Sequence, residues 1–193
     1  MLSKNINFKA FKLKLNGSKI KKDLKLLLLE NLPPLNSLKS SYKYSYKKKL
    51  ISRLKSFSKI RIIGMGGSIL GTEAIHDFLK EKINKKVVFI KNLNSSSHVD
   101  KKKSILNITV SKSGNTLETI INSNIFIKKN DKNIFITENR KSYLYLLAQK
   151  LKAEIVHHNN FIGGRYSVLS EVGMLPAELM GLSVVKFKQL NNL

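Results

Sequence analysis

Short apolar runs alternate with helical segments from Lys59 to His158, and this alternation leaves few folds open to the chain. Five runs rich in Ile, Val and Phe predict strands, at 61–64, 86–93, 105–111, 133–138 and 153–158. The segments between them predict helices at 68–81, 115–129 and 142–152, the first with Ile69, Leu70, Ile75, Phe78 and Leu79 on one side. Because the runs read as apolar throughout, both faces of the sheet should be covered. The pattern predicts an α/β fold with a doubly wound, five-stranded parallel sheet flanked by helices.

The residues outside this patterned region predict two further parts of the chain. Residues 1–58 carry no motif and predict a mostly helical N-terminal arm that is broken at Pro33-Pro34. Residues 59–182 form the predicted domain, and 183–193 lie beyond it. The length of 193 residues agrees with one core plus an extension.

The formal net charge of +24 would ordinarily suggest a nucleic acid or an anionic surface as partner. Of the 36 basic residues 32 are Lys, and they are spread along a chain rich in Asn and Ile, which indicates a compositional bias. The strongest local candidate for a nucleic-acid patch is SYKYSYKKKLISRLK at 41–55. We interpret this stretch instead as a solvated amphipathic helix, so nucleic-acid binding is the least favoured function.

The composition also excludes several kinds of site. The sequence contains no cysteine, which rules out a disulfide framework and thiolate metal sites and makes the cytoplasm the default location. No apolar run approaches the roughly 20 residues that a membrane-spanning helix needs. Neither a metal nor a cofactor is predicted.

Two glycine-bearing loops follow predicted strands, where parallel sheets bind their ligands. The first, GMGGSILG at 64–71, is neither of the two common nucleotide-binding loops. A dinucleotide fingerprint would need glycine at position 69, where the chain has Ile69. A nucleoside-triphosphate loop would need Lys and then Ser or Thr after Gly71, but Thr72 and Glu73 follow.

The second loop, SKSGNTLET at 111–119, gathers donors that suit a phosphate. Within six residues it offers three hydroxyls, an ammonium and a permissive glycine: Ser111, Ser113, Thr116, Lys112 and Gly114. A helix is predicted to begin there, and its first N–H groups would add donors. Asn115 and Glu118 have the spacing of a capping box. Because neither loop places a carboxylate for magnesium, the pair predicts a site for a monophosphate ester.

A third motif makes the resemblance to a known family specific. The two loops followed by FIGGRYSVLSEVGMLP at 161–176 resemble, in order and spacing, the glucose-6-phosphate isomerase family. The first two motifs are similar to those of sugar isomerase domains generally, and the third resembles that family's signature around its active-site arginine. The resemblance covers roughly 59–182 and implies the first of two sugar isomerase domains, so that 183–193 would begin a connection to the second domain. It implies the interconversion of glucose 6-phosphate and fructose 6-phosphate as the activity. It also implies a homodimer in the full-length protein.

The resemblance also implies roles for residues of this chain. The phosphate of a hexose 6-phosphate would lie on the second loop, at Ser111, Lys112, Ser113 and Thr116. Gly67 and Ser68 would line the sugar side of the site, together with Gly164. Arg165 would stand beside the reacting carbons, where a guanidinium that stays protonated stabilises enediolate charge.

The catalytic base is not among the residues that match. The family supplies its glutamate and histidine later in the sequence than the arginine signature, and no motif here corresponds to them. His157 and His158 end a predicted strand and are interpreted as residues of the sheet rim. Glu118, Glu171 and Glu178 read as helix positions. The chain therefore resembles the N-terminal portion of the enzyme, without its base.

Two further expectations follow from this interpretation. The apolar stretch MLPAELMGLSVV at 174–185 has no evident packing partner without a second domain, and we expect an exposed apolar patch there. The alternative function is a stand-alone sugar isomerase domain that binds a sugar phosphate as a regulatory ligand. GGRYS argues against that alternative, because a sensor needs no arginine at the reacting carbons.

Overall fold

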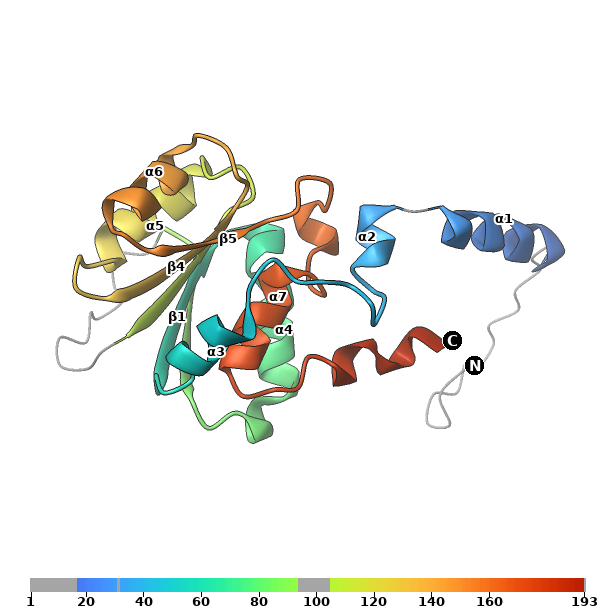
Figure 1. The fold of residues 1–193 in the computed structure, drawn as a ribbon, viewed down its shortest axis with the longest axis horizontal. Coiled ribbons are helices and arrows are strands. Elements are labelled where there is room, and N and C mark those ends of the chain that lie inside the picture. Colours follow the sequence, from blue (N-terminus) through green and yellow to red (C-terminus); the bar gives the residue numbers. More distant parts are fainter. Residues whose placement is uncertain (1–16, 31, 94–104, 193) are drawn as a thin grey trace.

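The computed structural model describes residues 17–30, 32–93 and 105–192, and its centre is an all-parallel, five-stranded sheet. The strands are arranged in the order β2-β1-β3-β4-β5 (Figure 1), with bounds β1 Lys59–Gly64, β2 Lys86–Ile90, β3 Leu106–Val110, β4 Lys132–Thr137 and β5 Glu154–His157. All five predicted strands are present, and the predicted α/β fold is confirmed. The second strand ends at Ile90, three residues before its predicted end.

Helices cover both faces of the sheet, as the apolar strands predicted (Figure 1). On one face α5 (Leu117–Phe126) packs against β1 and β3, and α6 (Tyr143–Lys150) packs against β4 and β5. On the other face lie α3 (Lys48–Leu54), α4 (Leu70–Phe78) and α7 (Glu171–Leu179). Since α4 joins β1 to β2 on one face, while α5 and α6 join β3 to β4 and β4 to β5 on the other, the sheet is doubly wound.

The main core lies between the sheet and the helices on the face that holds α7. Strand residues such as Ile60, Ile62 and Ile108 meet Leu175 and Leu179 of α7 there. The expectation of an exposed apolar patch at 174–185 is therefore wrong over α7, since every apolar residue of that helix is buried. The helix finds its packing partners in the sheet and α4 rather than in a second domain.

The helix α3 also belongs to this core. Its residues Leu50, Ile51 and Leu54 are buried in the same cluster as the strand residues. Part of the expected N-terminal arm thus packs against the sheet. Its expected break is confirmed, because α1 (Gly17–Leu29) ends before the two prolines, and α2 (Pro33–Asn36) begins with them.

A row of polar residues crosses three of the strands. The prediction that the strands are apolar throughout is therefore wrong at this row. Arg61, Asn107 and Asn133 are buried and lie side by side in register. Arg61 Nη1 donates to Asn107 Oδ1 at 3.1 Å and to the carbonyl oxygen of Phe126 at 2.9 Å. Asn107 Nδ2 donates to Asn133 Oδ1 at 2.8 Å and to Asp131 Oδ2 at 3.1 Å. Burial is tolerated because these groups hydrogen-bond one another.

The apolar side of α4 also differs from the prediction. Leu70 and Phe78 are 52% and 88% exposed, while Ile75 is buried. The buried stripe instead includes Thr72, whose hydroxyl donates to the carbonyl oxygen of Val172 at 3.2 Å. The helix begins only at Leu70, after a 3₁₀ turn at Gly66–Ser68.

Residues 42–46, which we call the tyrosine segment, are not the solvated helix that was predicted for 41–55; only Lys48–Leu54 is helical there. Its three tyrosines are half-buried, and Lys43 and Ser45 between them are exposed, in the alternation of an extended strand. The hydroxyl of Tyr42 donates to Glu171 Oε1 at 3.0 Å, and the backbone N–H of Ser45 donates to the same oxygen at 3.0 Å. The tyrosine segment is thereby fastened to the first turn of α7.

The last described residues return to the tyrosine segment. A 3₁₀ segment spans Lys186–Asn192, and the ammonium of Lys188 lies 4.6 Å and 4.5 Å from the ring centroids of Tyr42 and Tyr44. Such cation–π contacts stabilise a desolvated ammonium. The part expected to begin a connection thus packs against this domain.

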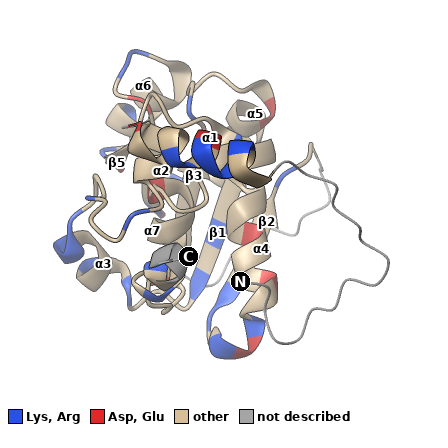
Figure 2. Ribbon diagram, turned by 90° about the vertical axis from the view of Figure 1, so that its right-hand side faces the viewer, with Lys and Arg blue, Asp and Glu red and all other residues tan. Residues whose placement is uncertain are grey.

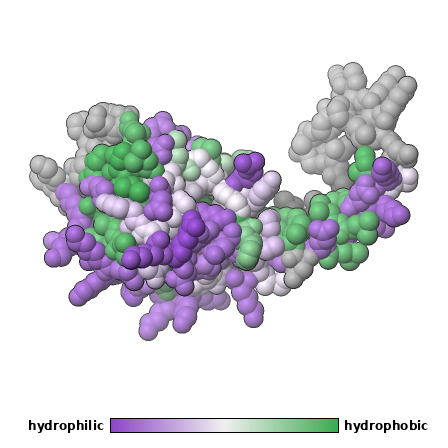
Figure 3. All heavy atoms as spheres, turned by 90° about the horizontal axis from the view of Figure 1, so that it is seen from above, coloured by the Kyte–Doolittle hydropathy of each residue, from purple (hydrophilic) through white to green (hydrophobic). Residues whose placement is uncertain are grey.

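The exposed surface bears both apolar and basic residues. α1 extends away from the sheet and has no buried residue, so that its leucines are visible beside its lysines (Figure 3). Basic residues lie on α1, on α3 and on the Lys80–Lys82 turn, which are well separated in Figure 2. In the described part of the chain, no helix combines the length and the apolarity needed to cross a bilayer.

Candidate functional site

The two glycine-bearing loops meet at one edge of the sheet, as predicted. They follow β1 and β3, which are neighbours, while β2 lies on the other side of β1. In a sheet of this order the chain winds in opposite directions from the β1/β3 boundary, and ligands bind in the crevice at that switch point. The fold therefore places both loops where a ligand is expected.

A cavity of about 450 Å³ opens at this switch point. Six of the eight predicted site residues line it: Gly67, Ser68, Lys112, Ser113, Thr116 and Gly164. Three residues that were not predicted complete the lining: Met65, Glu138 and Arg140. The lining comes from loops that follow β1, β3, β4 and β5, so segments far apart in the sequence share one site.

Ser111 is the predicted phosphate ligand that does not line the cavity. It is buried, and its hydroxyl shares a 3.0 Å hydrogen bond with the hydroxyl of Thr116. The same oxygen accepts the N–H of Gly114 at 3.2 Å. Ser111 therefore stabilises the conformation of the loop without lining the cavity, and its hydroxyl contacts the cavity lining through Thr116.

The predicted capping box at the start of α5 is also wrong. The N-cap residue is Thr116, and Asn115 Oδ1 accepts the N–H of Tyr143 at the start of α6, at 2.9 Å. Gly114 has φ +67°, a left-handed conformation that glycine adopts without strain. Within the described part of the chain no side-chain oxygen caps α5, so no cap there takes its first N–H groups.

The loop that carries Arg165 rests directly on the first glycine loop. A Cβ atom added to Gly67 would lie 2.6 Å from the carbonyl oxygen of Gly164 and 2.7 Å from the amide nitrogen of Arg165. Ser167 Oγ donates to the carbonyl oxygen of Gly164 at 2.7 Å and fixes the turn. The Arg165 side chain is exposed beside this contact and does not line the cavity itself.

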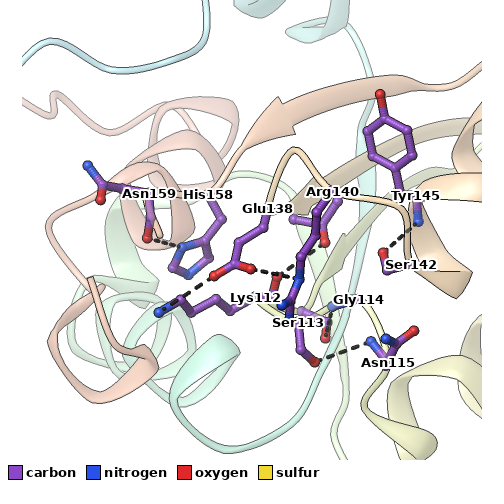
Figure 4. A network of polar contacts seen from close by, with 12 residues as sticks. Lys112, Ser113, Gly114, Asn115, Glu138, Arg140, Ser142, Tyr145, His158 and Asn159 are labelled. Carbon is purple, nitrogen blue, oxygen red and sulfur yellow. Dashed lines mark hydrogen bonds and ion pairs between the residues drawn. The ribbon is translucent and has the colours of Figure 1, made fainter. Parts of the chain in front are cut away.

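Glu138 and Arg140 follow β4 and form an ionic network with Lys112 (Figure 4). Glu138 Oε1 lies 3.7 Å from Lys112 Nζ, and Glu138 Oε2 lies 2.9 Å from Arg140 Nε. The two loops alone predicted no carboxylate here, yet the cavity contains one, because a third strand end contributes to it. The sequence did carry a signal, since the charged residues of ENR directly follow the strand at 132–137.

His158 lies behind this network, while its neighbour His157 is exposed, as expected for the sheet rim. The His158 side chain is buried, and its Nδ1 donates to the carbonyl oxygen of Asn159 at 3.1 Å. Its Nε2 has no hydrogen-bond partner among the described residues. Burial lowers the pKa of His158 below its ordinary value, and the hydrogen bond to Asn159 and the nearby Glu171 only partly oppose this shift.

This shift predicts a loss of stability in mild acid. Below the ordinary pKa of 6.5 the unfolded chain binds more protons than the folded one, so stability should fall as the pH drops through 6.5. We expect His158→Gln to flatten this decline and His157→Gln to leave it unchanged. Urea unfolding at about pH 7.5 and about pH 5.5 measures both effects. An equal decline in all three proteins would show that other groups cause it.

Comparison with solved structures defines the class of the domain. A hypothetical protein from Thermus thermophilus superposes with a TM-score of 0.68 at 21% identity, over 88% of this chain and 45% of that chain. The tagatose-6-phosphate ketose/aldose isomerase from Escherichia coli superposes with a TM-score of 0.56 at 15% identity, over 73% of this chain and 44% of that chain. The α/β fold of this chain is thus shared with both proteins, one of which is a sugar-phosphate isomerase.

Sequence comparison then identifies the family. The Phosphoglucose isomerase profile matches residues 49–192, and the chain belongs to that family. The glucose-6-phosphate isomerase of Methanocaldococcus jannaschii is 36% identical in an alignment of 146 residues that covers 69% of this chain and 35% of that protein. The chain thus spans about a third of the length of the curated relatives it matches. The family match begins within α3, the helix that packs into the main core.

Proposed function

We propose that this chain carries the sugar-phosphate-binding part of a glucose-6-phosphate isomerase. The observation that supports the proposal most directly is the convergence of Gly67, Ser68, Lys112, Ser113 and Thr116 on one cavity at the switch point of the sheet. The substrate class follows from the chemistry of this lining, which offers hydroxyl, ammonium and backbone donors to a phosphate. The particular hexose is inferred from the relatives, which are glucose-6-phosphate isomerases.

In this proposal the phosphate binds at the start of α5. Ser113 and Thr116 supply hydroxyl donors, Lys112 supplies a positive charge, and the uncapped N–H groups of α5 complete the anion site. Hydrogen bonds to a charged group are worth about 1.5–3 kcal/mol each, and the helix dipole adds about 0.3–1 kcal/mol. The side-chain and backbone donors therefore dominate the affinity. Gly67 and Ser68 would face the sugar.

Arg165 would stabilise the charge that develops during isomerisation. Moving a proton between neighbouring carbons passes through an enediolate, and a guanidinium stabilises its oxygen without acting as the acid. The exposed Arg165 stands on the loop that contacts Gly67, beside the sugar side of the cavity. It would approach the substrate when the sugar is bound there.

The base for proton transfer would come from another part of the protein. The carboxylate in the cavity lining, that of Glu138, is paired with two cations, and the buried His158 does not line the cavity. Because general acid–base catalysis contributes about 10²–10⁴-fold, we expect this chain alone to bind hexose phosphates while hardly isomerising them.

The binding part of the proposal is tested by calorimetry with 6-phosphogluconate, an anionic sugar phosphate. The double variant Ser113→Ala, Thr116→Ala should bind at least about tenfold more weakly than the parent, because two donors to the phosphate are lost. Ser52→Ala, a hydroxyl removed from the exposed side of α3, is the matched control and should bind normally. Equal affinity of all three proteins would exclude the SKSGNT loop as the phosphate site.

The catalytic part is tested by a coupled assay that converts fructose 6-phosphate to glucose 6-phosphate. We expect turnover far below that of a full-length isomerase. A rate close to the full-length rate that Arg165→Ala abolishes would show that the base lies within this chain.

A further inference from the structure

We propose that Arg140 is a further ligand of the substrate phosphate and that Glu138 is the residue that positions it. The inference rests on the proposed function and extends it to the loop after β4. Both residues line the same cavity as Lys112, Ser113 and Thr116. In Figure 4 the Arg140 side chain lies between Glu138 and Ser113, on the same side as the second glycine loop.

The geometry of Glu138 explains how Arg140 would be held. Glu138 is 7% exposed, and its Oε2 forms an ion pair with Arg140 Nε at 2.9 Å. The loop backbone adds to this, because the N–H of Arg140 donates to the carbonyl oxygen of Glu138 at 2.8 Å. An arginine side chain has five N–H donors, and this ion pair engages the Nε end of the guanidinium. Among the described residues nothing pairs with its terminal nitrogens, so their four donors are left for an acceptor in the cavity.

Glu138 is also tied to the phosphate loop. Its N–H donates to the carbonyl oxygen of Lys112 at 3.1 Å, and its Oε1 lies 3.7 Å from Lys112 Nζ. The carboxylate therefore stands between two cations that belong to two different strand ends. Any movement of the loop after β4 would shift Lys112 and Arg140 together.

Charge balance gives Arg140 a reason to be there. A carboxylate in the lining would repel a phosphate, and Lys112 alone would only neutralise it. With Arg140 included, the three side chains sum to one net positive charge beside the predicted phosphate position. A planar guanidinium also matches two phosphate oxygens at once, which an ammonium does not.

The first test compares two neighbouring cations on the same loop. Arg140→Ala should weaken binding of 6-phosphogluconate and of inorganic phosphate by about tenfold or more, through loss of charge-assisted hydrogen bonds. Lys141→Ala removes the same charge from an exposed residue that does not line the cavity, and should change either affinity by less than about threefold. Equal effects of the two variants would overturn the role of Arg140.

The second test addresses the positioning role of Glu138 by a double-mutant cycle. In a Glu138→Ala background, Arg140→Ala should weaken phosphate binding by less than about threefold, because the guanidinium is no longer held. In a Glu138→Gln background the amide oxygen still accepts from Nε, so the effect of Arg140→Ala should return toward tenfold. A purely structural role for Glu138 would shift the melting temperature without this coupling, and that result would overturn the positioning role.

The two proposals fail in different ways. If the parent chain binds neither 6-phosphogluconate nor inorganic phosphate, the proposed function fails. If the parent binds both, and the double variant at Ser113 and Thr116 loses binding while Arg140→Ala matches Lys141→Ala, this further inference alone fails.

Discussion

Gly67→Ala should reduce 6-phosphogluconate binding on the order of 10²-fold, the equivalent of losing two charge-assisted hydrogen bonds. The added Cβ would lie 2.6 Å from the carbonyl oxygen of Gly164 and 2.7 Å from the nitrogen of Arg165. Both are backbone atoms, so neither can turn away as a side-chain end would. The loop that carries Arg165 must separate from the first glycine loop, and the cavity that both line must change shape. Calorimetry on the purified variant measures the loss.

Gly163→Ala provides the matched control for this prediction. Its added Cβ would approach only the Tyr166 ring, at 3.7 Å, which is an ordinary contact distance. Gly163 directly precedes Gly164 in the loop that carries Arg165, and its φ is not positive, so an added methyl group causes no backbone strain. We expect the affinity for 6-phosphogluconate to be nearly unchanged. Normal binding by Gly67→Ala would mean that the contact between the two loops does not shape the site.

Arg61→Ala should lower the free energy of unfolding by about 3–5 kcal/mol, the range for breaking a buried charged network. The change leaves Asn107 Oδ1 and the carbonyl oxygen of Phe126 without their donor. It also removes the guanidinium that lies 5.4 Å from the Phe126 ring centroid and opens a cavity between β1 and α5. Urea unfolding measures the change.

Arg53→Ala is the control for Arg61. Its side chain is exposed and forms an ion pair with Glu154 at the surface. Exposed ion pairs contribute about 0–1 kcal/mol, so the loss of stability should be several times smaller than for Arg61→Ala. Similar unfolding midpoints for both variants would contradict a structural role for the buried polar row.

The strands and the fold class could be predicted because they follow from local patterns in the sequence. Strand and helix periods, and the rule that parallel sheets bind ligands at the carboxyl ends of their strands, sufficed to bring the two glycine loops together. The polar row was beyond this reasoning, since Arg61, Asn107 and Asn133 lie in three separate runs and no local pattern pairs them. Only the register of the sheet shows that they are partners.

The candidate site was predicted where a motif carried it and missed where none did. Glu138 and Arg140 lie in a short loop without glycine, and the pairing of Glu138 with Lys112 depends on the strand order. Asn115 had the right spacing for a cap, but a tertiary contact with α6 uses its side chain. The tyrosine segment was misread because a strand-like alternation was taken for a helix, although its period of two was visible in the sequence.

The long-range closure of the main core bears on how the chain folds during its synthesis. The tyrosine segment and α3 cover the sheet together with α7, and the hydrogen bond between Tyr42 and Glu171 joins residues 129 positions apart. The α5–α6 face closes with elements that are adjacent in sequence, whereas the opposite face must wait for α7. At roughly 5–20 residues per second, the ribosome leaves Ile60, Ile62 and Ile108 uncovered for seconds. The nascent domain therefore presents a transient apolar sheet face, which is the kind of surface that chaperones shield, and its final closure should limit the folding rate.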